Sequence, residues 1–145
     1  MKLRLFCALT LFIVASIVSF SLAGGGAGGN FDKLTDADRK TFQDRFTKEI
    51  WPLLHRGGKD SCTGCHNGKV VSALKFAGSP DKDFPKLLKD GFFIPDDSGS
   101  LLTRITSKNK KQMMPPPGKA SPWKQADIET LQKFVDDLDK KQQKK

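Results

Sequence analysis

The chain has 145 residues, a length that suits one folded domain. Its formal net charge is +9, but no nucleic-acid-binding motif accompanies this charge. The basic character therefore indicates acidic protein partners or a solvated lysine-rich surface, and it excludes nucleic acid as the expected ligand.

The first 23 residues have the pattern of a secretory signal peptide. Lys2 and Arg4 form a short basic region, residues 5–22 are almost wholly apolar, and Ser21-Leu22-Ala23 ends the run with small residues at the two positions that a signal peptidase recognises. We expect export to the periplasm or another extracytoplasmic space, with Cys7 removed along with the signal. A retained membrane anchor is the alternative, because about 18 apolar residues can just span a bilayer.

The next segment, residues 24–34, is rich in glycine and is expected to be a flexible linker. We expect the folded domain over residues 35–140 and a basic tail over 141–145. Because the signal carries two basic residues and no acidic one, residues 24–145 keep a net charge of +7.

The pattern of residues 36–55 predicts the first helix. Thr35 is a plausible N-cap, and acidic residues occupy the first turn. Apolar side chains recur at helical spacing, at Phe42, Phe46 and Ile50. Pro52 is expected to end or kink this helix in its last turn.

Residues 62–66 read Cys-Thr-Gly-Cys-His, the attachment motif of c-type haem. In this motif the thiols of Cys62 and Cys65 add to the two vinyl groups of the porphyrin. Their spacing lets one turn of backbone place both sulfurs along one porphyrin edge. His66 then becomes an axial ligand of the iron. We therefore expect one covalently attached haem c, and attachment fits an exported chain.

Two readings without haem compete with this one. After export, Cys62 and Cys65 could form a disulfide or a redox-active dithiol. Together with His66 and His55 they could also form a cramped zinc site. The dithiol interpretation is weak because it leaves His66 without a role, and because the chain lacks an alternating strand and helix pattern.

The middle of the chain predicts a turn and a short helix. Asn67-Gly68 is typical of a tight turn. A helix is expected over residues 84–90, with Asp83 as its cap, Pro85 in its first turn and Gly91 at its end.

The remaining segments are also predicted to be helical. A further helix is expected to start at residues 96–98, and Leu101, Leu102 and Ile105 would form its apolar face. Residues 108–111 are expected to form a solvated loop. The last helix is expected to begin near residues 121–122 and to carry an apolar stripe at Ile128, Leu131, Phe134, Val135 and Leu138. The prediction is an all-α fold with a small apolar core.

Few side chains could occupy the sixth coordination position opposite His66. The preferred ligand is Met114, which directly abuts three prolines in a stiff segment. Met113 and His55 are the alternatives, and an open sixth position is another.

The order of these motifs resembles a class I cytochrome c, and more narrowly a planctomycete-type cytochrome c domain, over about residues 35–140. The carriers of this resemblance are the Ile-Trp-Pro-Leu-Leu helix end at 50–54, the haem motif, the Ser-Leu-Leu-x-Arg-Ile segment at 100–105 and Met114-Pro115-Pro116. The resemblance implies helices wrapped around one haem, with His66 and Met114 on the iron.

The function implied by this resemblance is transfer of single electrons between acidic redox proteins, without enzymatic activity or a small-molecule substrate. A haem enzyme or gas sensor with an open sixth site is the alternative. Because the chain lacks tyrosine, aromatic packing on the haem would use other residues. The candidates are Phe92, Phe93, Trp123 and Phe134. Arg104 could neutralise a propionate or simply be solvated.

Overall fold

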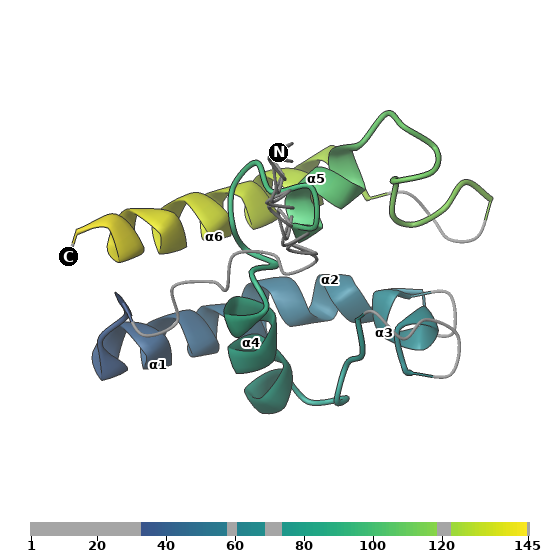
Figure 1. The fold of residues 1–145 in the computed structure, drawn as a ribbon. Coiled ribbons are helices and arrows are strands. Elements are labelled where there is room, and N and C mark those ends of the chain that lie inside the picture. The colour runs from purple at the N-terminus through teal and green to yellow at the C-terminus, as the bar shows by residue number, and fades with distance from the viewer. Residues whose placement is uncertain (1–32, 58–60, 69–73, 119–122, 145) are drawn as a thin grey trace, which may run out of the picture.

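The computed structural model of the chain describes residues 33–57, 61–68, 74–118 and 123–144. This described part is mostly helical and contains no strand (Figure 1). The helical elements are α1 (Asp36–Arg45), the π-helical turn η2 (Phe46–Ile50), α2 (Trp51–His55), α3 (Cys62–Cys65), α4 (Pro80–Lys89), α5 (Leu101–Thr106) and α6 (Gln125–Gln143).

The first predicted helix is confirmed as the run of α1, η2 and α2. Thr35 is its N-cap, and its side-chain oxygen accepts a hydrogen bond from the Asp38 N–H at 3.1 Å. The π-helical turn η2 immediately precedes Pro52, and there the Trp51 N–H bonds to the Phe46 carbonyl. Because proline has no N–H and crowds the preceding turn, the wider turn lets the chain remain helical as far as His55.

The helices form two layers, which Figure 1 shows one above the other. The first contains α5 and α6, which pack against each other. The second contains the α1–η2–α2 run, with α3 and α4 beside it. The long helix α6 packs against α1 and η2, while α4 packs on η2 from another side.

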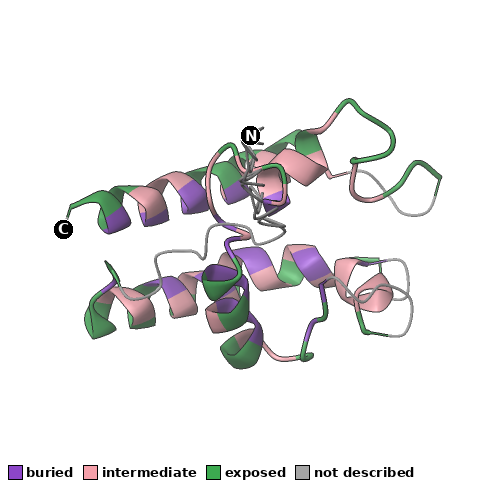
Figure 2. Cartoon of the chain, in the orientation of Figure 1, coloured by how far each residue is buried: buried purple, intermediate pink, exposed green. Residues whose placement is uncertain are grey.

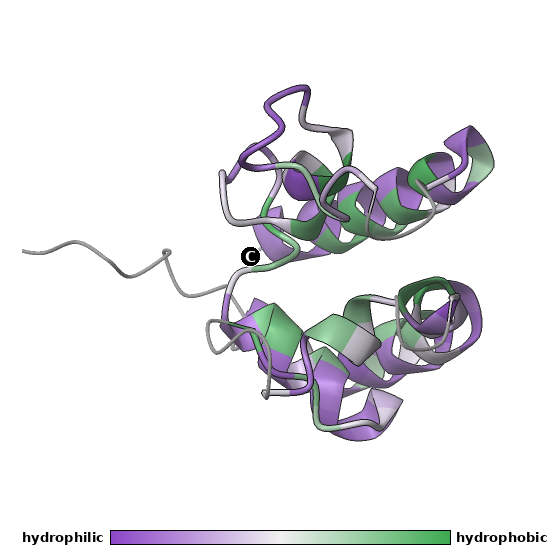
Figure 3. Cartoon of the chain, turned by 90° about the vertical axis from the view of Figure 1, so that its right-hand side faces the viewer, coloured by the Kyte–Doolittle hydropathy of each residue, from purple (hydrophilic) through white to green (hydrophobic). Residues whose placement is uncertain are grey.

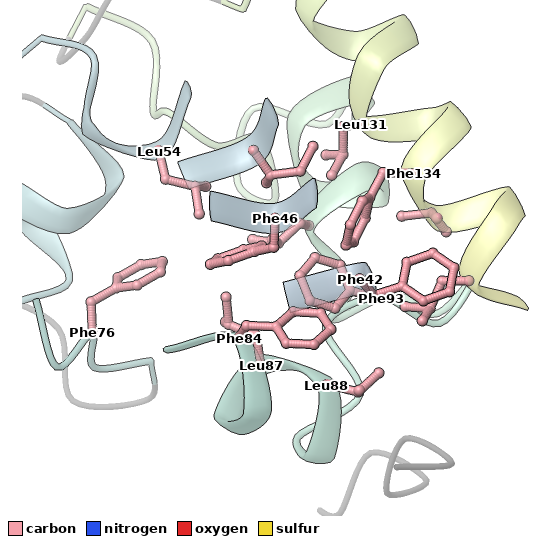
Figure 4. Close-up of a cluster of buried hydrophobic side chains, with 14 of the residues drawn as sticks. Phe42, Phe46, Leu54, Phe76, Phe84, Leu87, Leu88, Phe93, Leu131 and Phe134 are labelled. Atoms are coloured by element: carbon pink, nitrogen blue, oxygen red, sulfur yellow. The ribbon is translucent and has the colours of Figure 1, made fainter. Parts of the chain in front are cut away.

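The core lies between these layers and is rich in phenylalanine (Figure 4). Phe46 is fully buried, and its ring centroid lies 5.3 Å from that of Phe84 and 6.4 Å from that of Phe134. The Arg45 guanidinium covers the Phe134 ring at 5.4 Å and forms an ion pair with Asp137 at 3.1 Å. Apolar burial and this pairing hold α6 against the first helix.

The predicted start of α4 is wrong. Its N-cap is Ser79 rather than Asp83, and Pro80 occupies the first turn. Asp83 lies inside the helix and is buried, and its carboxylate accepts the N–H groups of Ala77 and Gly78. A buried carboxylate requires such partners, so Asp83 stabilises the loop before the helix. Pro85 consequently lies in the helix interior.

The predicted start of α5 is also displaced. Ser100 is the N-cap, and its side chain accepts the Thr103 N–H at 3.2 Å. The carboxylate of Asp97 instead accepts the Gly99 N–H at 2.6 Å, which makes a turn before the helix. The predicted apolar face is present, with Leu101 buried and Leu102 and Ile105 packed against the core.

The last helix begins at Gln125, later than expected, and residues 121–122 lie outside the described residues. The Asp127 carboxylate accepts the Lys124 N–H at 3.1 Å and stabilises the helix start. The helix continues to Gln143, so it includes part of the segment assigned to the tail. Leu34, assigned to the linker, is buried in the core.

The predicted signal and most of the linker lie outside the described residues. Among the residues that are described, no helix combines the length and the apolar character needed to span a bilayer.

Candidate functional site

The Cys-x-x-Cys segment forms the single helical turn α3. The Ser61 hydroxyl caps this turn by accepting the Gly64 N–H at 2.9 Å. The carbonyl of Cys62 accepts the His66 N–H at 2.8 Å. The turn therefore places the two cysteines three residues apart on one helical turn, directly before the histidine.

The ring of His66 is oriented by the chain that returns after the motif. Its Nδ1 lies 3.2 Å from the carbonyl oxygen of Leu74, and that oxygen can only accept a hydrogen bond. The Nδ1 atom must therefore carry a proton, and in a neutral ring Nε2 keeps its lone pair. Histidines that bind metals commonly donate their other ring N–H to a carbonyl in this way.

The same returning segment makes two further contacts with His66. The Phe76 N–H donates to the His66 carbonyl at 2.8 Å. The Phe76 ring lies edge-on to the imidazole, with centroids 6.4 Å apart. The backbone and the ring of His66 are thus both positioned by residues 74–76.

The predicted turn at Asn67-Gly68 makes this return possible. Gly68 has φ of 83°, in the left-handed region that favours glycine. A Cβ atom there would lie 2.8 Å from the side chain of Lys75. The Asn67 side chain also donates to the Gly64 carbonyl at 2.7 Å. This hydrogen bond holds the turn against α3.

Cys62 and Cys65 are both half-buried free thiols in this structure. Cys62 packs against the hydrophobic core. Burial raises the pKa of Cys62 to about 11, and hydrogen bonding lowers it only in part. Because the thiolate is the reactive form of cysteine, a raised pKa makes Cys62 a poor attacking thiol at neutral pH.

The methionine segment is attached to α5. The Met114 N–H donates to the Arg104 carbonyl at 2.9 Å, and the Met113 N–H donates to the Asn109 carbonyl at 2.9 Å. Both methionines are half-buried. Residues 107–118 and α3 lie at the same end of the molecule, the loop in the α5–α6 layer and α3 in the other (Figures 1 and 3).

Other predicted site residues lie elsewhere or have other contacts. Phe93 and Phe134 are buried in the core, with ring centroids 5.3 Å apart. Phe92 packs partly buried at the margin of that core. The ring of His55 lies against Trp51 with centroids 3.9 Å apart. Among the described residues, no three His, Cys, Asp or Glu side chains are grouped so as to hold a metal ion.

Two contacts at this end of the molecule were not predicted from the sequence. They are the Leu74 carbonyl on His66 and the ion pair of Arg56 with Asp127 at 2.7 Å. Each joins residues distant in sequence and carries no local pattern. Only the Asn67-Gly68 turn signalled that the chain reverses onto the motif.

Comparisons of the chain with protein-family models, curated proteins and solved structures return no match.

Proposed function

We propose that this chain is an exported mono-haem cytochrome c domain that carries single electrons. The observation that carries the proposal is the state of His66 in its motif. Its Nδ1–H is engaged by Leu74, so Nε2 is available to a metal. The fold proposed is that of a class I cytochrome c of the planctomycete type, with which the all-helical structure is compatible.

The residues of the motif fit a covalently bound haem. Cys62 and Cys65 are free thiols on one helical turn, and His66 follows them directly. When bound, haem c would supply an iron that is reversibly oxidised and reduced by one electron. Two thioether bonds would retain the group outside the cell, where a dissociated cofactor is lost.

Met114 is the proposed sixth ligand. Its backbone N–H is tied to α5 through Arg104, and three prolines stiffen the chain that follows. A methionine ligand raises the reduction potential of a histidine-ligated haem. With both axial positions occupied by side chains, no position is left for a substrate, so the proposed activity is electron transfer and not catalysis.

An acidic redox protein is the proposed type of partner. Lys108, Lys110 and Lys111 lie exposed in the loop that leads to the methionines (Figure 2). None of these lysines forms an ion pair with the residues that the structure describes. Exposed cations of this kind attract an acidic partner and orient it without holding it for long.

The proposed location is the periplasm or another space outside the cytoplasm. This location rests on the signal pattern of residues 1–23 and on the extracytoplasmic attachment of haem c. A membrane would be involved only if the apolar segment were retained as an anchor.

The raised pKa of Cys62 disfavours the dithiol alternative. The attacking thiol of a Cys-x-x-Cys oxidoreductase normally has a lowered pKa, whereas burial raises that of Cys62 to about 11. The zinc alternative is not favoured either, because the described residues contain no cluster suited to that ion.

A visible spectrum of the exported protein tests the proposal. The reduced sample should show low-spin haem that does not respond to carbon monoxide, and the oxidised sample should show a weak far-red band from methionine on iron. High-spin haem that binds carbon monoxide would instead support an enzyme or gas sensor with an open sixth site.

A further inference from the structure

Three ion pairs between described residues join the two layers and follow one another along α6. They are Lys141–Asp38 at 3.0 Å, Arg45–Asp137 at 3.1 Å and Arg56–Asp127 at 2.7 Å. As the position in α6 falls from 141 to 127, the position of the partner rises from 38 to 56, so α6 runs antiparallel to the α1–η2–α2 run. Of the three pairs, Arg56–Asp127 is the one that adjoins the haem motif, because Arg56 lies six residues before Cys62.

Apolar burial does not extend to the start of α6, where this pair lies. The buried residues of the helix begin at Leu131, and none of residues 125–130 is buried. The Asp127 side chain is nevertheless only 14 % exposed, and it also accepts a backbone N–H at the start of the helix. An ion pair with so little exposure is screened less than a fully solvated one. The attachment of the start of α6 therefore depends on the Arg56–Asp127 pair more than the rest of the helix does.

The two proposed axial ligands belong to different layers. The Met114 N–H donates to the carbonyl of Arg104 in α5, and α5 packs against α6. His66 follows α3, which packs against α2. The methionine loop and α3 lie at the same end of the molecule, one in each layer (Figure 3). Coordination by both side chains therefore requires the two layers to keep a fixed spacing at this end.

We propose that Arg56 and Asp127 are positioning residues for the sixth ligand, because their ion pair holds the layer that carries Met114 against the layer that carries His66. This inference rests on the proposed function, since it assumes that both side chains ligate one haem iron. Without the pair, the start of α6 would move away from the motif more often, and α5 would move with it. The sixth position would then be open for a larger fraction of the time, while the core and the other two ion pairs hold the rest of the fold.

Two substitutions by glutamine provide a matched test on the exported holoprotein. Arg56→Gln removes the pair beside the motif and leaves Asp127 at the start of α6. Lys141→Gln removes one positive charge of similar exposure, 50 % against 45 %, at the other end of α6. Added imidazole binds the oxidised iron only when the sixth position is open, so its apparent affinity follows the open fraction. We expect Arg56→Gln to raise this affinity several-fold and Lys141→Gln to leave it unchanged.

The conservative variant Arg56→Lys keeps the positive charge and should keep the imidazole affinity close to that of the unmodified protein. An unchanged affinity in Arg56→Gln would overturn the proposal. An equal rise in Lys141→Gln would also overturn it, because the effect would then come from a general loss of stability.

A second measurement works with or without haem. Backbone amide hydrogen exchange, followed by NMR on the exported chain, reports local opening of the helices. In Arg56→Gln, exchange should accelerate several-fold at residues 128–130 and stay slow from Leu131 onward. In Lys141→Gln, faster exchange should appear at the end of α6 instead. No acceleration in Arg56→Gln, or a uniform acceleration along α6, would refute a local role of the pair.

The two measurements separate this inference from the proposed function. A chain exported without haem would contradict the function together with the ligand role, and the exchange experiment would still decide whether the pair holds the start of α6. A haem-loaded chain in which Arg56→Gln and Lys141→Gln have equal imidazole affinities would retain the function and refute the positioning role.

Discussion

At His66 the fold orients a side chain before any metal is involved. The carbonyl of Leu74 fixes the Nδ1 proton, and Phe76 supports both the backbone and the ring. A ligand held in this way loses little conformational freedom on binding, which favours tight axial coordination. The proposed sixth ligand is less well defined, because the two adjacent methionines, Met113 and Met114, are both half-buried.

Alanine substitutions separate the two methionines. Met114→Ala should open the sixth position, so that the reduced protein binds carbon monoxide and its reduction potential falls. Met113→Ala, which removes an equal side chain one residue away, should leave the far-red band and the potential unchanged. Absorption spectra of the two variants decide the assignment, and a reversed result would identify Met113 as the ligand.

The Cys62 thiol predicts a pH dependence that haem attachment should remove. In the free-thiol chain the folded pKa is about 11, whereas an unfolded cysteine titrates near 8.5. Above about pH 8.5 the unfolded state loses the proton first, so the free energy of unfolding should fall by about 2 kcal/mol by pH 10 and by about 3 kcal/mol as the pH approaches 11.

Denaturant titrations at pH 8 and pH 10 can measure this dependence. A Cys62→Ser variant of the haem-free chain is the control for lysine titration and should lose less stability. The haem-loaded protein carries no proton on this sulfur and should behave like that control. An equal loss in the free-thiol chain and in Cys62→Ser would contradict the assigned pKa.

At the scale of elements, the apolar stripes predicted the helices well and their ends poorly. The stripe of α6 and the N-cap Thr35 could be identified because both depend on neighbouring residues. The start of α4 was mistaken because Asp83 looks like a cap, although Ser79-Pro80 carries an equally good signal. The helix starts at Pro80 and not at Phe84 because the Asp83 carboxylate is buried and accepts the backbone N–H groups of residues 77–78. The sequence pattern does not reveal this burial.

The candidate site also has features that the sequence predicts and features that it does not. The Cys-x-x-Cys-His motif, the turn after it and the methionine segment are local sequence patterns, so they could be predicted from the sequence. The contacts of Leu74 and Arg56 could not, because their partners lie 8 and 71 residues away in the chain. No spacing rule connects such pairs.

The Asp127 side chain contacts both Arg56, which follows α2, and the start of α6, so its substitution should weaken both contacts. Asp127→Asn removes the ion pair with Arg56 and weakens the bond to the Lys124 N–H. We expect the free energy of unfolding to fall by about 1–2 kcal/mol at neutral pH. Glu129→Gln is the control, because Glu129 is exposed and, among the residues that the structure describes, is hydrogen-bonded only to Gln125 on the same helix.

The effect of Asp127→Asn should depend on pH. The hydrogen bond from Arg56 lowers the pKa of Asp127. Its contribution is therefore present above about pH 4 and is lost as the pH falls through the lowered pKa. Unfolding curves of Asp127→Asn and the unmodified chain should converge in acid, and a difference that persists there would contradict this origin.

At the scale of the whole molecule, the exposed lysine loop and the candidate site at α3 lie at the same end. The lysine loop at residues 108–111 leads into the methionine segment, and α3 lies at the same end (Figure 1). Acidic residues are instead distributed along α6, many of them in ion pairs or helix contacts. If the proposed haem is attached at α3, the arrangement predicts that the proposed acidic redox partner approaches at this end of the molecule.

Charge reversal tests this approach with small redox reagents. Lys108→Glu with Lys111→Glu should slow oxidation by anionic ferricyanide several-fold at low salt, and added salt should reduce the difference. Lys82→Glu with Lys89→Glu changes the net charge equally on α4 and should have a smaller effect. Equal slowing by the two pairs would show that net charge alone is responsible.

The central proposal is that Cys62 and Cys65 both carry one haem. The most direct test is mass spectrometry of the denatured, exported protein, followed by analysis of the peptide that contains residues 62–66. We expect the mass of one haem to remain on the chain after denaturation and to map to both cysteines of that peptide. Two free thiols, or a disulfide between them, in a host that matures c-type haem would contradict the proposal.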